Sequence, residues 1–140
     1  MAKKFRGAEI VKEIDEALDK GLARFLINTQ SKLSASSPID TGRLASSWMI
    51  GKGVPDRDTR PEDWAEPGAK RVEVKQYGGP ITMDSDWYIS NSLPYAARAA
   101  YDPGYVGRRG GGAGDWFSRI ENGLPKDAEK AFDFFLRKVK

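Results

Sequence analysis

A long amphipathic pattern at the start of the chain constrains its architecture more than any other feature. Apolar residues recur at helical spacing through residues 8–33, which predicts one long helix with a single apolar face. The residues of this stripe are Ile10, Ile14, Ala17, Leu18, Leu22, Phe25, Leu26 and Leu33. Opposite charges four residues apart, at Lys12, Glu16 and Lys20, support the helix on its other face.

A second apolar stripe near the C-terminus predicts a closing helix. We expect it to begin at Pro125, because proline suits the first helical position. Its apolar residues are Ala128, Ala131, Phe132, Phe135, Leu136 and Val139. Residues 115–122 are predicted to hold a separate helical turn.

Turn signals separate the first helix from the middle of the chain. Residues 31–37 read as a polar connector, and Pro38 prevents a helix from continuing through it. Asp40 or Thr41 can then cap a short helix that runs to about Trp48. Leu44 and Trp48, four residues apart, would share one face of it.

Short strands joined by turns occupy the middle of the chain and predict an antiparallel sheet. Residues 48–53 and 71–77 are strand candidates, the second because charged and apolar residues alternate along it. After a turn at 78–80, a strand starts at 81–83 and is clearest over 86–92, and residues 94–101 form a short helix.

The predicted fold is therefore α+β: a small antiparallel sheet packed by a long N-terminal helix and a C-terminal helix. With 140 residues, the chain is expected to form one domain, 1–140. To this domain we add a basic N-terminal arm at 1–7 and extended loops at 52–69 and 101–114.

The composition argues against an enzyme. The chain has neither cysteine nor histidine, which excludes disulfides, thiolate zinc sites and every triad with an imidazole base. We therefore expect no catalytic residue and no cofactor, and the remaining enzymatic alternative is a hydrolase that uses carboxylates alone. No apolar run approaches the roughly 20 residues of a membrane span, so we expect a protein made in a cytoplasm, with no membrane partner.

Two motifs about fifty residues apart carry a family resemblance. The first comprises Pro38, Asp40, Thr41, Gly42, Leu44 and Ser47, and the second comprises Asn91, Pro94, Tyr95 and Ala96. An aromatic, a glycine and an arginine-bearing loop come next, at Tyr101, Gly104, Arg108 and Arg109. In this order they resemble the neck and tail-completion proteins of tailed bacteriophages, the family of the minor tail protein Z of phage lambda.

The resemblance implies a structural virion protein made in the host cytoplasm. It would form a ring, a hexamer or dodecamer, at the head–tail junction around the DNA channel. Its partners would be copies of itself, head-closure or adaptor proteins, and tail-terminator or tail-tube proteins, with at most weak non-specific contact to DNA. The candidate subunit-contact residues are Arg43, Trp64, Tyr95, Tyr101, Tyr105, Arg108 and Arg109.

Both long loops admit more than one interpretation. The 52–69 loop is either a solvated flexible loop or an extension that becomes ordered on a neighbouring subunit, and Trp64 favours the second. Arg108 and Arg109, before a glycine run, suit a flexible loop, a nucleic-acid contact or a docking contact in a ring. The alternative function is accordingly a nucleic-acid-binding regulator or packaging accessory protein.

A metal site is not expected. Asp84, Asp86 and Asp102 could be imagined as a cluster, but their spacing matches no calcium-binding loop.

Overall fold

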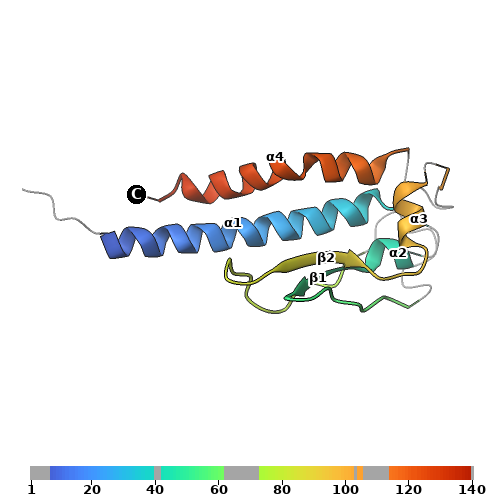
Figure 1. Ribbon diagram of the computed structural model, residues 1–140, viewed down its shortest axis with the longest axis horizontal. Coiled ribbons are helices and arrows are strands. Elements are labelled where there is room, and N and C mark those ends of the chain that lie inside the picture. The colour runs from blue at the N-terminus through green and yellow to red at the C-terminus, as the bar shows by residue number, and fades with distance from the viewer. Residues whose placement is uncertain (1–6, 40–41, 62–72, 103, 106–113, 140) are drawn as a thin grey trace, which may run out of the picture.

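The N-terminal pattern forms α1, an unbroken helix over Gly7–Ser36, in the computed structural model of the chain (Figure 1). The structure describes residues 7–39, 42–61, 73–102, 104–105 and 114–139. The hydroxyl and the amide of Ser37 both donate to the carbonyl oxygen of Leu33, at 2.6 and 3.1 Å. These bonds close the helix directly before Pro38, which has no amide hydrogen to continue it.

The polar connector predicted over residues 31–37 is wrong, because α1 continues through most of it. Leu33 and Ser34 are buried, so the last turn of the helix is held by packing on this face. Serines in this turn misled the prediction because their local preference favours turns, and burial of the neighbouring leucine outweighs that preference.

A turn at Gly42 leads into α2, Arg43–Ser46. The φ of Gly42 is 86°, a left-handed conformation that favours glycine, and its carbonyl accepts the Ser46 hydroxyl at 2.7 Å. The predicted caps, Asp40 and Thr41, lie outside the described residues.

Trp48 does not belong to the short helix. It begins β1, Trp48–Lys52, where its backbone pairs with Asn91. The prediction that Leu44 and Trp48 share a helix face is therefore wrong, because sheet pairing takes over the backbone two residues after α2 ends.

The sheet has two antiparallel strands, β1 and β2, and β2 spans Trp87–Asn91. Ile50 lies opposite Ile89 in the register. Both strands confirm predictions, whereas the strand expected to start at 81–83 is wrong because residues 83 and 84 form a turn.

The alternating segment 71–77 does not form the predicted strand over its described part, 73–77. The carbonyl of Lys75 instead accepts a hydrogen bond from the side chain of Gln30 on α1, at 3.1 Å. Val74 packs against the main core, so the apolar positions of this segment are used without a strand ladder.

The chain ends in two further helices, α3 over Ala96–Tyr101, as predicted, and α4 over Trp116–Leu136. Pro125 lies inside α4, so the prediction that the helix starts there is wrong, and the turn predicted over 115–122 is its first part. Apolar residues on both sides of the proline are buried, Trp116 before it and Ala131 after it. This burial offsets the backbone hydrogen bond that the proline removes.

Helix α1 lies between α4 and the two-stranded sheet (Figure 1), which confirms the α+β prediction. On one side Gly21 lets α4 approach closely, since a Cβ at this position would lie 2.6 Å from Cδ1 of Phe132. On the other side Gln30 donates to the carbonyl of Trp48 at 2.7 Å.

The main core lies where α1, β1 and α4 meet. Leu33, Trp48 and Trp116 form it, and the two indole rings meet edge to face with centroids 6.4 Å apart. Each indole N–H has a partner: Trp48 donates to the Ser37 hydroxyl at 2.8 Å, and Trp116 donates to the Ala99 carbonyl at 3.1 Å. The aromatic core therefore fixes the positions of α3 and the α1–α2 turn as well as the long helices.

Candidate assembly site

The two sequence motifs meet at one end of the molecule. The side-chain amide of Asn91, at the end of β2, donates to the carbonyl of Leu44 in α2 at 2.9 Å. Its amide oxygen accepts the backbone N–H of Leu93 at 3.3 Å. Asn91 thus ties α2 to the turn that leads into α3, across 47 residues of sequence.

A small apolar cluster completes this junction. Leu44, Leu93 and Ala99 are buried together, and partly buried residues pack against them, namely Tyr95, Ala96 and Tyr105. Both tyrosines were candidate contact residues, and each contributes part of its surface to this cluster.

Arg43 and Ser47 hold the loop that comes after β1. Nε of Arg43 donates to the carbonyl of Arg60 at 2.8 Å, and the amide of Arg60 donates to the Ser47 hydroxyl at 3.0 Å. Arg43 in α2 and Ser47 directly after it therefore clamp the backbone of Arg60, one through its carbonyl oxygen and the other through its amide. The clamp gives Arg43 a role within the fold of its own chain.

Tyr101, at the end of α3, is the candidate contact residue with the greatest exposure among those described. Its side chain is 64% exposed, and its ring meets Phe117 edge to face at 5.3 Å. Phe117 in turn stacks on Trp48 at 6.2 Å. An exposed aromatic ring that rests on the core is a rigid surface feature, and such residues are enriched in protein interfaces.

Charges at this end occur in opposite pairs. Arg98 lies 3.6 Å from Asp102, and Arg119 lies 3.0 Å from Asp115, in both cases one helical turn apart and exposed. Among the described residues these pairs leave no concentrated positive charge around Tyr101 of the kind that a nucleic-acid surface requires, and Arg108 and Arg109 lie outside them.

Two of the remaining predicted residues, Pro38 and Pro94, lie within the described part of the chain, and the others do not. Pro38 is buried behind the end of α1, and Pro94 is exposed before α3. The other candidates lie outside the described residues: Asp40, Thr41, Trp64, Arg108 and Arg109.

Two of the three aspartates considered for a metal, Asp84 and Asp102, have other partners. Asp84 accepts hydrogen bonds from Thr82 and Ser85, and the bond from Thr82 lowers the pKa of the Asp84 carboxyl. Asp102 pairs with Arg98 on α3. Within the described residues no group of three or more acidic side chains is placed to hold a metal ion.

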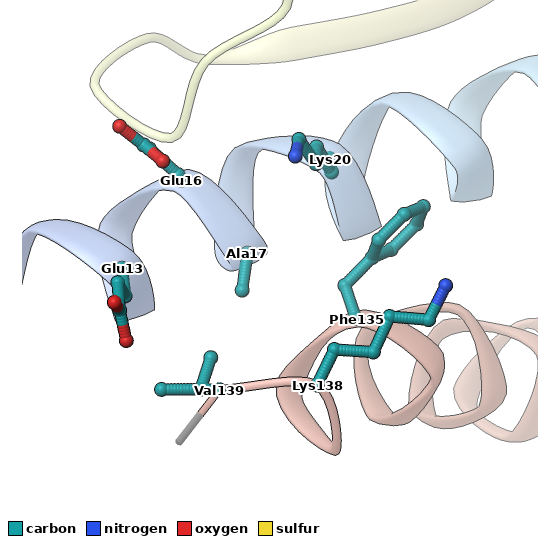
Figure 2. A pocket seen from close by; sticks show the side chains of 7 residues that line it. All are labelled: Glu13, Glu16, Ala17, Lys20, Phe135, Lys138 and Val139. Atoms are coloured by element: carbon teal, nitrogen blue, oxygen red, sulfur yellow. The ribbon is translucent and has the colours of Figure 1, made fainter. Parts of the chain in front are cut away.

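A groove along the α1–α4 pair is a surface that the sequence analysis missed. One hollow of about 240 Å³ lies near the chain ends, and Figure 2 shows Lys20 of α1 and Lys138 beyond α4 at its wall. A larger hollow, of about 580 Å³, is lined by Arg24, Lys130 and Phe134 among others. The cations of α1 recur every four residues, at Lys20 and Arg24, and that spacing was the available signal.

Gln30 is a second residue that was missed. It is buried and donates to two backbone carbonyls, those of Trp48 and Lys75. Its place between Leu26 and Leu33 on the apolar side of α1 was the available signal, because a buried polar side chain needs a partner.

Searches beyond the chain itself give no identity. Compared with models of protein families, with curated proteins and with solved structures, the chain has no significant match. Among the helices of the described residues, none has the length and apolarity needed to cross a membrane.

Proposed function

We propose that this chain is a structural protein of a tailed bacteriophage virion that forms a ring at the head–tail junction. The ring joins the tail to the head-closure ring and leaves a central channel for DNA. The chain acts by contact alone, with neighbouring copies and with the proteins above and below it.

The observation that carries the proposal is the meeting of the two motifs at Asn91 and Leu44. The motifs that resemble the neck and tail-completion family build a single junction, with a shared apolar cluster of Leu44, Leu93 and Ala99. Residues that form one structural unit support a common origin for the two motifs better than two isolated short matches do.

The shape of the molecule also suits a ring. One end carries the motif junction with Tyr101 on its surface. The other end consists of α1 and α4, which extend there beyond the sheet (Figure 1). A closed ring requires contacts in which different patches of one subunit meet its neighbour, and the two unlike ends offer different patches.

Loss of the protein in the virus that encodes it tests the proposal. A stop codon in the gene should yield separate heads and tails in electron micrographs, and the wild-type chain supplied in trans should restore joined particles. Joined, infectious particles without the chain would end the proposal.

A gel shift separates this function from the nucleic-acid-binding alternative. A regulator is expected to bind duplex DNA with a Kd of about 10⁻⁸ M or tighter at physiological salt, whereas a ring component is not. The neutral ion pairs at Arg98 and Arg119 favour the ring component.

A further inference from the structure

An exposed aromatic ring flanked by cations lies in the groove between α1 and α4. The side chain of Phe134 is 44% exposed. The guanidinium carbon of Arg24, from α1, lies 4.2 Å from the ring centroid, and Nζ of Lys138 lies at the same distance of 4.2 Å. Two cations from opposite sides of the groove thus converge on one solvent-facing ring.

The charge around Phe134 is predominantly positive. Lys130 lines the same hollow one helical turn away. The carboxylate of Asp127, also in this hollow, is engaged by Lys32 at 2.7 Å. Among the described residues, three cations therefore remain around the ring beyond that ion pair, namely Arg24, Lys130 and Lys138.

The adjoining hollow near the chain ends differs in charge. Figure 2 shows Glu13 and Glu16 on α1, with Lys138 and Val139 below this helix and the side chain of Glu16 pointing away from them. Its lining holds two carboxylates besides Lys20 and Lys138, and Lys138 also lies over the Phe134 ring. Among the described residues of the two hollows, positive charge is in greater excess around Phe134, and we call this part the Phe134 surface: Arg24, Lys130, Phe134 and Lys138.

We propose that the Phe134 surface binds the acidic segment 62–66 of a neighbouring copy of this chain. The segment reads Glu-Asp-Trp-Ala-Glu, with three carboxylates around Trp64. Three carboxylates match the three cations of the surface, and an indole is the aromatic group that cations bind best. The segment lies outside the described residues, so the proposal uses only its sequence.

This inference rests on the proposed ring and names the two patches that meet in it. Arg60, two residues before the segment, is clamped at α2 by Arg43 and Ser47. The Phe134 surface lies on α4 and the facing side of α1, and α1 separates α4 from the sheet (Figure 1). Contact between unlike patches on two copies is the heterologous arrangement that a ring needs.

Charge reversal in the full-length chain tests the pairing. One variant carries Arg24→Glu and Lys138→Glu, a second carries Glu62→Lys and Asp63→Lys, and a third carries all four substitutions. Sedimentation velocity measures self-association, and circular dichroism during heating measures folding. Each double variant should weaken self-association by about tenfold or more, because like charges then face each other. The fourfold variant should regain most of it.

A matched control separates this pairing from net charge. Lys12→Glu with Lys126→Glu makes the same change in net charge at two exposed lysines that line neither hollow. The control should associate like the wild type.

The outcomes distinguish this inference from the proposed function. If the protein associates but ignores the reversals, the pairing is wrong and the ring proposal stands. If the wild type stays monomeric at every concentration reached, both fail. If the charge-reversal variants melt differently but associate like the wild type, the segment lies on its own subunit. If they lose only binding to duplex DNA in the gel shift, nucleic acid binds the Phe134 surface. Either result overturns the pairing.

Discussion

Substitution of Gly21 by alanine should destabilise the protein, although alanine is the better helix former. Gly21 is buried in α1, and a Cβ there would lie 2.6 Å from Cδ1 and 3.0 Å from Cα of Phe132. The ring of Phe132 can turn away, but its Cα belongs to the backbone of α4. The added methyl therefore pushes the two helices apart.

The magnitude comes from two opposing effects. Replacing a helical glycine by alanine stabilises a helix by about 1 kcal/mol. Overpacking a well-filled contact costs about 1–3 kcal/mol. With backbone in the way, we expect the cost to exceed the gain and the free energy of unfolding to fall by about 1 kcal/mol.

Urea unfolding monitored by far-ultraviolet circular dichroism gives the measurement. Gly123→Ala is the matched control, because its Cβ would meet only Asp127, at 3.8 Å in ordinary contact. This control should raise stability by up to about 1 kcal/mol. In a Phe132→Ala background the ring is gone but the Cα remains, so much of the penalty at Gly21 should persist. Equal stabilisation by both alanines would refute the close approach of α1 and α4.

Two more substitutions test contacts on the sheet side of α1. Gln30→Ala leaves the carbonyls of Trp48 and Lys75 without their donor and should lower the free energy of unfolding by about 1–3 kcal/mol in urea titrations. Gly51→Ala places a Cβ 2.3 Å from the carbonyl oxygen of Val54, so β1 or its adjoining loop must shift, and thermal melts should show a loss of at least about 1 kcal/mol. Gln76→Ala and Gly78→Ala serve as the controls, because Gln76 is exposed and a Cβ at Gly78 would meet no atom within 4 Å. Each control should change the free energy of unfolding by less than about 0.5 kcal/mol. Losses in the controls equal to those at Gln30 and Gly51 would contradict these contacts.

The strongest periodic patterns predicted the architecture well. The stripe from Ile10 to Leu33 became α1, and the alternation around Trp87 became β2. Both patterns are long or clean enough that local preference and tertiary packing agree, and such segments are the ones that sequence identifies reliably.

The errors occurred where tertiary contacts replaced a local preference. Pro125 was read as a helix start, yet α4 runs through it because apolar residues on both sides are buried. The segment 73–77 alternates like a strand, but Gln30 takes the carbonyl that a strand would use. Neither outcome can be deduced from the segment itself, because each depends on residues elsewhere in the chain.

The candidate site was predicted in its parts but not in its assembly. Both motifs were identified, and their meeting through Asn91 and Leu44 required the fold. The Phe134 surface was missed because its members come from both ends of the chain, with Arg24 and Lys138 more than a hundred residues apart. Periodicity within one helix carries no information on which face of the other helix lies opposite.

The two ends of the molecule differ in how many elements pack together, and this difference determines which end unfolds locally first. At one end the aromatic core joins helices and sheet, whereas the first turns of α1 extend past both the sheet and the end of α4 (Figure 1). Val11 is 58% exposed there, so fraying of these turns uncovers little apolar surface. Amide hydrogens at the tip therefore exchange through local opening, while those near Trp48 exchange only when the whole domain unfolds. The first turns of α1 are thus the part of this helix with the lowest local stability, and the end with the aromatic core has the highest.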